Sequence, residues 1–401
     1  MCTAYYLTSY GHQVTVISDD HDHTGCSYGN AGMLVPSHFI PLAAPGVIPQ
    51  AMKWMLRSDS PFHIRPRFSR GLVKWGWCFY KACTSAKVEQ AIPMLSKMHL
   101  TSRDLYIQME MDEGLDFGLQ TKGLLMLCKS KKTLESERAV AEKSRKIGIP
   151  AEVLSLRELV QVEPNVSFDV AGAIHYPIDA HLSPQKFMSQ LKAVLISRGV
   201  SFVAGKVSGF ERGGSQLKSV RVGEHVQEFD QFIVAAGMWS EQLLKGLEIN
   251  LPMQAGKGYS VEVSQPRVMP GICALLAEAK VSMTPMNGGI RFGGTMELNG
   301  MGRTVNARRF AGLVKSIPQY MPQIIEKDLQ QGKPWVGLRP CSPDGLPYVG
   351  HVSGYNNLMV STGHAMMGMS LGPVSGQLIA QLASGIKPTL DLRLLNPGRF
   401  N

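Results

Sequence analysis

Apolar and polar residues follow two periods along the chain and predict alternating helices and strands. Residues 4–10 are apolar on one helical face and are followed by Gly11, a residue typical of a helix C-terminus. Residues 13–17 are a short apolar run that predicts a buried strand. A helix leading into such a strand is half of a dinucleotide-binding unit, whose other half is a strand and a G-x-G-x-x-G turn before the helix. That other half does not occur in this sequence.

The same alternation continues to the end of the chain. Ser155, followed three residues later by Glu158, predicts a helix that begins with a capping box. Gly213 and Gly214 predict the turn of a hairpin over residues 207–222. Together these patterns predict an α/β fold. Helices are predicted over 132–146, 155–160, 184–198 and 373–384, buried strands over 124–127, 200–203 and 230–240, and antiparallel strands over 261–263, 281–284 and 290–295.

Composition narrows the class of protein. The 401 residues include 41 lysines and arginines against 31 acidic residues, and 44% are hydrophobic, which predicts a globular protein of two or three folding units. The basic excess suits an acidic ligand, an anionic membrane or nucleic acid. Because no basic run interleaved with aromatics and no helix-turn-helix or zinc-finger spacing occurs, we do not predict nucleic-acid binding. The seven cysteines contain no C-x-x-C pair and predict free thiols, with neither a disulfide framework nor a metal site.

We expect neither a signal peptide nor a membrane-spanning helix. The most apolar segment, residues 39–56, contains Pro41, Pro45 and Pro49, so we expect that no helix runs through it. The tryptophans and basic residues in and after this segment have two interpretations. One is a helical part of a substrate domain, and the other is a contact with a membrane interface. The residues concerned are Lys53, Trp54, Arg57, Phe62, Arg65, Arg67, Arg70, Trp75 and Trp77.

One arginine stands among residues that fix the shape of the backbone. Arg339 lies in the stretch 335–350, surrounded by prolines and glycines. A guanidinium group binds a carboxylate through two parallel charge-assisted hydrogen bonds, so this stretch predicts a carboxylate site. A second glycine-rich stretch, residues 361–370, precedes the predicted helix 373–384. Its backbone N–H groups and the positive end of the helix dipole would suit an anion or a polarised carbonyl.

The stretches 335–350 and 361–370 together resemble the C-terminal flavin and substrate elements of the D-amino acid oxidase superfamily. The resemblance is closest to bacterial D-amino acid dehydrogenases and glycine oxidase-like enzymes, and it extends over essentially the whole chain. It implies a discontinuous Rossmann-like FAD-binding domain and a substrate-binding domain with a mixed or antiparallel sheet. The FAD-binding domain would comprise residues 1–38, 180–250 and 335–401, and the substrate-binding domain residues 39–179 and 251–334.

The resemblance also implies which residues contact FAD. Small residues in the loop 25–33 would let backbone approach the planar flavin, and the strand that ends at Gly237 would contact the cofactor from the second side of the sheet. An acidic residue is expected at the end of the second strand, where Ser18 stands and Asp19 follows. The residues expected to contact FAD are Asp19, Ser27, Gly29, Asn30, Ala31, Gly32, Val207, Ala236, Gly237, Trp239, Gly337, Gly363, His364, Ala365, Met366 and Gly368.

Three residues are expected to serve the reaction. Arg339 would hold the substrate carboxylate, and Tyr259, which resembles the active-site tyrosine of the superfamily, would assist it. In such enzymes the Cα hydrogen leaves as a hydride and the amine needs only to be neutral, so no dedicated base is required. We therefore expect His364 to shape the flavin edge or line the pocket more than to transfer a proton. Arg291 is a further candidate cation, which we expect to face solvent.

The implied reaction is FAD-dependent oxidation of a D-amino acid to an imino acid, which hydrolyses to a 2-oxo acid where the amine is primary. Glycine, sarcosine, D-proline and D-hydroxyproline remain alternative substrates, and the electron acceptor would be a quinone, oxygen or another carrier. We expect a cytoplasmic enzyme of amino acid catabolism, with peripheral contact at the inner face of the cell membrane as an alternative location.

The absence of the phosphate-binding turn leaves a rival interpretation. Similar flavoproteins have this strand and turn immediately before the position of Met1, so we expect a truncated sequence or a degenerate family member. Lost hydrogen bonds to the cofactor diphosphate would weaken FAD binding, and a non-catalytic fragment is then the alternative to an enzyme.

Overall fold

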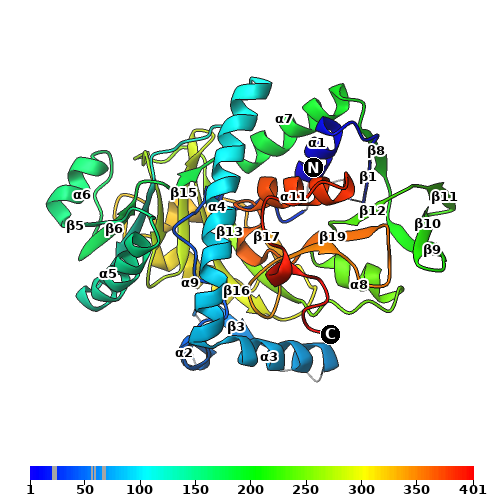
Figure 1. The fold of residues 1–401 in the computed structure, drawn as a ribbon. Helices are drawn as coiled ribbons and strands as arrows, with labels where there is room; N and C mark the ends of the chain where they lie inside the picture. The colour runs from blue at the N-terminus through cyan, green and yellow to red at the C-terminus, as the bar shows by residue number, and fades with distance from the viewer. Residues whose placement is uncertain (20–24, 56, 58–59, 66–68) are drawn as a thin grey trace.

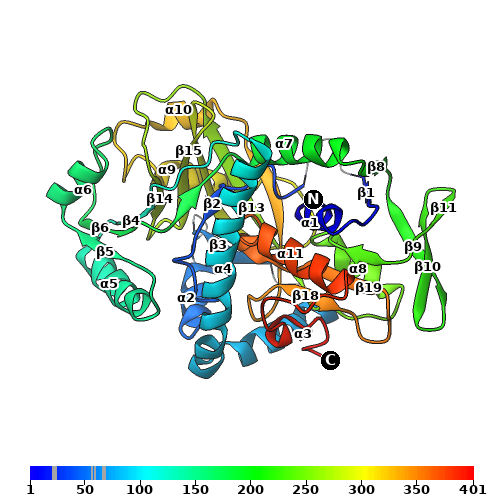
Figure 2. The same cartoon turned by 45° about the horizontal axis from the view of Figure 1, so that its top comes forward.

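Two bodies of secondary structure lie on either side of one long helix. The structure is a computed structural model that describes residues 1–19, 25–55, 57, 60–65 and 69–401. Helix α4 (Ser85–Glu113) crosses the centre of the view in Figure 1, with a large sheet on one side and a set of short strands and helices on the other. Figure 2 shows the same division from a second direction. The arrangement is the predicted α/β class.

The larger body is a nine-stranded mixed sheet. Its strands, in spatial order, are β17 (Trp335–Cys341), β13 (Gln254–Val263), β16 (Gly289–Leu298), β15 (Val281–Met286), β14 (Cys273–Leu276), β4 (Leu124–Cys128), β6 (Gly172–Tyr176) and β5 (Glu152–Leu154), with β3 (Phe62–Ile64) paired to β16. The pairs β14–β4 and β16–β3 are parallel and the others antiparallel, so the prediction of antiparallel strands here is confirmed. Apolar side chains of β13, β14 and β16 form the core of this body with helices that cover the sheet.

The smaller body contains the parallel pairs expected of a nucleotide-binding domain. Its strands are β1 (Thr15–Ser18), β8 (Ser201–Ala204), β12 (Phe232–Val234), β19 (Leu358–Thr362), β18 (Tyr348–His351), and the hairpin set β9 (Val207–Gly213), β10 (Gln216–Val222) and β11 (His225–Glu228). β1 pairs in parallel with β8, and β12 in parallel with β19. The two-residue strands β2 (Met33–Leu34) and β7 (Ala180–His181) also pair.

Five of the eleven α-helices in the described residues lie close to where local signals predicted them. The helix α6 has the capping box of Ser155 and Glu158, and α7 begins with a proline in its first turn. The expectation that no helix runs through residues 39–56 is confirmed, because α2 (Val47–Met55) begins after Pro41 and Pro45. Pro49 lies in its first turn, where a backbone N–H needs no partner. Besides α4, the helices of the described residues are α1 (Cys2–Ser9), α2 (Val47–Met55), α3 (Arg70–Ala82), α5 (Lys131–Lys146), α6 (Leu156–Val162), α7 (Pro184–Ser197), α8 (Trp239–Lys245), α9 (Ala307–Ser316), α10 (Glu326–Gln330) and α11 (Gly372–Ala383), with the 3₁₀ turns η1 (Ala365–Met367) and η2 (Arg393–Leu395).

Helix α4 and strand β17 connect the two bodies. Leu95 and Met98 of α4 are fully buried in one core with residues of α1, α7 and α11, which belong to the smaller body. Strand β17 makes the reverse connection. Its backbone pairs with β13 in the large sheet, although the strands that follow it in sequence, β18 and β19, lie in the smaller body. Each expected domain therefore contributes one element to the other. Across the described ranges, no helix combines the length and apolarity needed to cross a membrane.

Candidate active site

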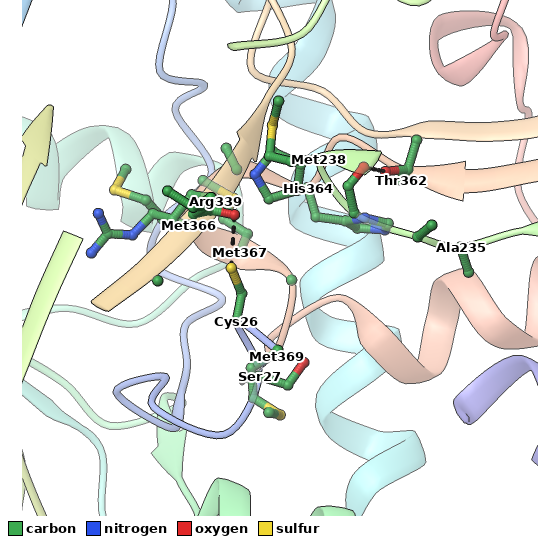
Figure 3. Close-up of a pocket in the computed structure, with 18 of the residues that line it drawn as sticks. Cys26, Ser27, Ala235, Met238, Arg339, Thr362, His364, Met366, Met367 and Met369 are labelled. Carbon is green, nitrogen blue, oxygen red and sulfur yellow. Dashed lines mark hydrogen bonds between the residues drawn. The ribbon is translucent and has the colours of Figure 1, made fainter. Parts of the chain in front are cut away.

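A cavity of about 2840 Å³ lies between the two bodies. A typical pocket for a drug-sized ligand has about 300–1,000 Å³, so this cavity is large enough for a dinucleotide together with a small substrate. Its wall is formed by β1, β12 and β17, by the loop 25–31 and by residues 364–370. Figure 3 shows part of the wall, where side chains from β17 and from residues 362–369 lie near Cys26 and Ser27.

Arg339 lies on the edge strand β17 and its side chain lines this cavity. One of its nitrogens, Nη1, donates a hydrogen bond to the backbone carbonyl of Thr295 at 2.7 Å. In the part of the chain that the structure describes, no carboxylate forms an ion pair with this guanidinium group. Burial lowers the pKa of Arg339 from its ordinary value. A carboxylate ligand would relieve this cost by supplying the missing negative charge.

Two glycines of β13 make room for the Arg339 side chain. Gly256 pairs with Arg339 and Gly258 pairs with Gly337, so both glycines lie on the same face of the sheet as the arginine. A Cβ atom added at Gly258 would lie 2.1 Å from Nη1 of Arg339. The guanidinium group therefore lies directly against bare backbone, and any side chain at position 258 would displace it.

Tyr259 lies on the opposite face of β13 from Arg339. Its hydroxyl donates to the buried carboxylate of Glu297 and accepts a hydrogen bond from the backbone N–H of Asn306 at 2.9 Å. Burial and Glu297 hold the pKa of Tyr259 well above its ordinary value, so the phenol stays neutral. Both hydrogen-bonding positions of the hydroxyl are thus used away from Arg339. This geometry does not support the expected role of Tyr259 in binding the same carboxylate.

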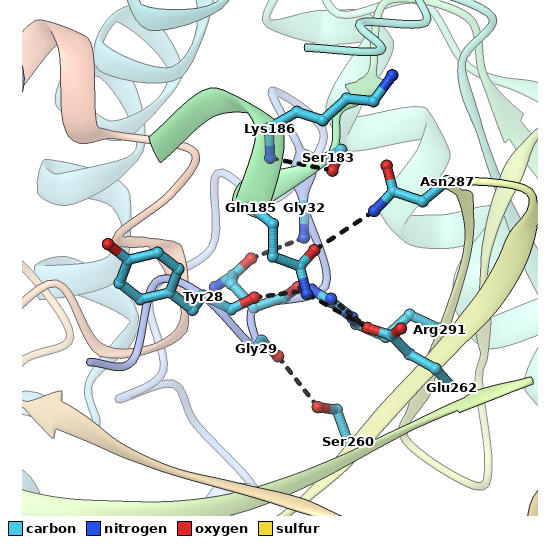
Figure 4. Close-up of polar contacts among 11 residues, drawn as sticks. Tyr28, Gly29, Gly32, Ser183, Gln185, Lys186, Ser260, Glu262, Asn287 and Arg291 are labelled. Atoms are coloured by element: carbon cyan, nitrogen blue, oxygen red, sulfur yellow. Dashed lines mark hydrogen bonds and ion pairs between the residues drawn. The ribbon is translucent and has the colours of Figure 1, made fainter. Parts of the chain in front are cut away.

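Arg291 does not face solvent, and that expectation is wrong. Its side chain is 1% exposed, because both faces of β16 are covered. It forms an ion pair with Glu262 and donates to the carbonyls of Tyr28 and Asn30 at 3.1 and 2.6 Å. Figure 4 shows these contacts between the large sheet and the loop 25–32. A strand arginine between two apolar neighbours gave no local signal of burial, since its partners are distant in sequence.

His364 lies at the start of the turn η1, next to the end of β17. Its Nε2 atom is 2.9 Å from the hydroxyl of Ser375 in α11, and its backbone forms an isolated bridge with Cys341 on β17. Burial lowers the pKa of His364 to about 4, so the ring is neutral near pH 7. Two residues at this turn have positive φ, Gly363 at 77° and Ala365 at 47°. A Cβ atom at Gly363 would collide with the ring of Tyr348.

A chain of hydrogen bonds connects the end of β12 to β19 on one side of the cavity. The hydroxyl of Ser240 donates to the hydroxyl of Thr362 at 3.2 Å, and Thr362 donates to the carbonyl of Gly237 at 2.9 Å. This chain ties the end of β12 to β19. Cys26 donates to the carbonyl of Leu338 at 2.7 Å and so fixes the loop 25–31 to β17. Cys26, Met238 and Thr362 line the cavity but were not predicted, because only the folded backbone brings them to it.

The other end of the cavity lies at the N-terminus of α1. The first hydrogen bond of this helix joins the N–H of Tyr5 to the carbonyl of Met1 at 2.9 Å, so the preceding N–H groups have no partner within the helix. Met1, Thr3 and Ala4 line the cavity. Among the described strands, β1 pairs only with β8 and β12 only with β19, and residues of both β1 and β12 line the cavity. The positive end of α1 therefore faces a space that would suit a diphosphate.

Most residues expected to contact ligands lie around this one cavity. Gly32 and Gly363 are the two exceptions, since neither lines it. Gly32 instead packs against the backbone of Leu182, and Gly363 against Tyr348. The expected residues that line the cavity are Asp19, Ser27, Gly29, Asn30, Ala31, Val207, Ala236, Gly237, Trp239, Tyr259, Gly337, Arg339, His364, Ala365, Met366 and Gly368.

Comparison with known proteins identifies the family. The model of the family described as FAD dependent oxidoreductase matches residues 1–382. A D-amino acid dehydrogenase from Rhizorhabdus wittichii is 31% identical over 398 residues, covering 97% of this chain and 94% of the relative. A D-amino acid dehydrogenase from Granulibacter bethesdensis is 29% identical over 399 residues, covering 98% and 94%.

Solved structures show the same fold. Glycine oxidase from Geobacillus kaustophilus superposes with a TM-score of 0.78 at 21% identity, covering 99% of this chain and 95% of the other. Iminodiacetate oxidase from Chelativorans sp. gives a TM-score of 0.75 at 19% identity, covering 99% and 95%. The chain belongs to the FAD-dependent oxidoreductase family, and the resemblance drawn from its sequence is confirmed.

The protein is therefore an FAD-dependent oxidoreductase, and its cavity fits that cofactor. The free N–H groups of α1 lie at one end and Arg339 lines the wall toward the other. Between them, the loop 25–31 and the end of β12 present backbone with small side chains, which suits contact with a planar ring. Residues at both ends of the cavity thus provide groups that FAD and an anionic substrate require.

Proposed function

We propose that this protein oxidises a D-amino acid, with the substrate carboxylate bound to Arg339. The observation that carries this proposal is the Arg339 guanidinium group, which lines the cavity with a single carbonyl partner and without an ion pair in the described part of the chain. A free amino acid is small, anionic at one end and able to form two hydrogen bonds to a guanidinium group. The relatives named D-amino acid dehydrogenase support this substrate class.

The residues around Arg339 orient the substrate and exclude water. Arg339 fixes the carboxylate, while apolar residues such as Met366 and Met367 line the same part of the cavity. Bound FAD supplies the oxidising chemistry by accepting the hydride from Cα. The ring of His364 is neutral at pH 7 and forms part of the cavity wall. We assign it no proton transfer, because the substrate amine reacts in its neutral form. The product is an imino acid, which releases a 2-oxo acid and ammonia in water where the amine is primary.

Glycine, sarcosine and D-proline remain competing substrates in this proposal, because each carries a carboxylate that Arg339 could bind. The electron acceptor is proposed to be a quinone or oxygen. A non-catalytic flavoprotein fragment is the rival function, and it predicts no turnover with any of these compounds.

Turnover by flavin-loaded protein with an artificial electron acceptor tests the proposal. The panel contains D-alanine, L-alanine, glycine, sarcosine, D-proline and ethylamine, which is alanine without its carboxylate. We expect D-alanine to exceed ethylamine in kcat/KM by about 100-fold or more, the effect of losing a close charge pair. Equal rates with ethylamine would reject the role of Arg339, and a preference for L-alanine would reject the substrate class.

Peripheral contact with a membrane is a second part of the proposal. Helix α2 buries none of its side chains, and α3 buries only Trp75 and Ala82. Val73, Trp77 and Tyr80 are 69%, 57% and 63% exposed on α3. In Figure 1, α2 and α3 lie along the lower edge of the molecule.

Charge favours an anionic lipid surface as the partner of this edge. Residues 41–88 contain eight lysines and arginines, namely Lys53, Arg57, Arg65, Arg67, Arg70, Lys74, Lys81 and Lys87, and one acidic residue, Asp59. Exposed tryptophan and tyrosine side chains among basic residues are typical of segments that lie in the membrane interface. We propose that the exposed face of α2 and α3 contacts the membrane in this way.

A further inference from the structure

Three consecutive backbone carbonyls of the loop 25–32 are bound by side chains of the large sheet. The carbonyls of Tyr28 and Asn30 accept hydrogen bonds from Nη1 of Arg291, at 3.1 and 2.6 Å. The carbonyl of Gly29, between them, accepts one from the hydroxyl of Ser260 at 3.1 Å. Figure 4 shows the loop held in this way above β13 and β16.

Arg291 is itself held rigidly. Its Nε and Nη2 atoms both donate to Glu262 on the neighbouring strand, which leaves Nη1 to bind the loop. Glu262 pairs directly with Arg291 across the sheet, and its carboxylate also accepts a weak hydrogen bond from Gln185 of α7 at 3.5 Å. A guanidinium group buried to this extent is costly unless every donor is used in good geometry. The planar fork of arginine meets that requirement where a lysine would not.

The consequence for the loop is a fixed direction of its peptide groups. The three carbonyls point toward the sheet, and the ring of Trp335 covers Gly29, where a Cβ atom would lie 2.1 Å from the ring. In the described structure, the N–H groups of Gly29 and Ala31 have no hydrogen-bond partner, and both residues line the cavity. Donors that remain free in a folded loop are suited to bind a ligand.

We propose that Arg291 is a positioning residue, which holds the backbone of Tyr28, Gly29 and Asn30 so that the N–H groups of Gly29 and Ala31 face the flavin. Arg291 itself belongs to the large sheet, so it also couples the substrate side of the protein to the flavin side. This inference rests on FAD binding, which family membership establishes, and not on the identity of the substrate.

The test compares Arg291→Gln with a matched variant of another buried arginine. Arg309 of α9 is also buried and donates to the carbonyls of Ser60 and Phe62, which are not part of the flavin loop. Arg309→Gln therefore controls for general loss of stability. The readouts are the Kd of FAD for the apoprotein, the visible absorption spectrum of bound flavin, and the thermal unfolding temperature of each variant.

We expect Arg291→Gln to weaken FAD binding about tenfold or more, as the loss of charged hydrogen bonds to two carbonyls predicts. It should also shift the visible absorption maxima of the flavin, whereas Arg309→Gln should lower the unfolding temperature and leave both flavin readouts at parental values. Arg291→Lys should restore part of the affinity. Should Arg291→Gln not fold, Ser260→Ala removes only the Gly29 contact and should cause a smaller change of the same kind. Parental FAD affinity and spectrum in the folded Arg291 or Ser260 variants would overturn the proposal, as would equal flavin changes in Arg309→Gln.

Discussion

Replacing Arg339 by leucine tests how the cavity binds its substrate. Among the residues that the structure describes, the guanidinium group makes one hydrogen bond, to the carbonyl of Thr295 at 2.7 Å. The free energy of unfolding should therefore decrease by about 1 kcal/mol, the net contribution of one such hydrogen bond to stability. Substrate binding should be weakened far more, because the substrate carboxylate would then lie unpaired in a partly buried site.

The expected loss of binding free energy between enzyme and substrate is about 3–5 kcal/mol, the cost of removing one partner from a buried charge pair. In kinetic terms this is roughly a 10²–10³-fold decrease in kcat/KM, or more. Arg339→Lys should recover only part of the loss, because an ammonium group supplies a point charge and cannot form the two parallel bonds.

The assay measures kcat/KM for D-amino acids with an artificial acceptor, on parent and variants with equal flavin content. Equal flavin content separates substrate binding from cofactor binding. Ethylamine serves as the matched control substrate, because it has no carboxylate and should be affected little by the change. Near-parental kcat/KM in Arg339→Leu would refute the reasoning and place the carboxylate elsewhere in the cavity.

Three further outcomes follow from the structure. Gly258→Ala should displace the Arg339 side chain and raise KM for D-amino acids about tenfold or more without altering flavin content. An unchanged KM would contradict the expected clash, in which the new Cβ atom would lie 2.1 Å from Nη1 of Arg339. Burial raises the pKa of Asp179 from 3.8 to about 7, so the folded protein binds a proton there between pH 4 and 7 that the unfolded chain does not, and the stability contributed by this group falls as pH rises through that window. Relative to the parent, the free energy of unfolding of Asp179→Asn should therefore increase by on the order of 2–4 kcal/mol as the pH rises from about 4 to 7.5. Unfolding of both proteins measured across this range tests the expectation, and a difference that does not change with pH would argue against it. The combined variant Lys53→Gln, Lys74→Gln and Trp77→Ala should sediment with acidic vesicles about tenfold less than the parent at low salt, since each basic residue contributes about 1 kcal/mol to membrane binding. A control variant neutralises lysines of α5. An equal loss of sedimentation in this control, or no vesicle binding by the parent, would exclude membrane contact by α2 and α3.

Local signals predicted much of the fold. The capping box at Ser155, the proline at the start of α7 and the paired glycines of the hairpin each act over a few residues, so the sequence alone reveals them. The short apolar runs of β1 and β12 were identifiable for the same reason. Their assembly into parallel pairs followed from the family resemblance.

The site was harder to predict because it depends on strand register. The sequence alone shows only that Tyr259 shares a strand face with Lys257 and Val261, which lie two residues away on either side. The pairing of β13 with β17 decides that Tyr259 and Arg339 lie on opposite faces of the sheet. Arg291 illustrates the same limit, since its partners Glu262 and Asn30 lie 29 and 261 residues away. Residues with distant partners are assigned correctly only when the fold is known.

The central claim is tested most directly by mixing flavin-loaded protein with single amino acids in the absence of oxygen and of any acceptor. Oxidised flavin absorbs blue light and loses this absorption when it receives a hydride. We predict that excess D-alanine bleaches the flavin within the time of turnover, that L-alanine leaves it oxidised, and that pyruvate appears in proportion to the flavin reduced. A flavin that L-alanine bleaches equally well, or that no amino acid bleaches, would contradict the account.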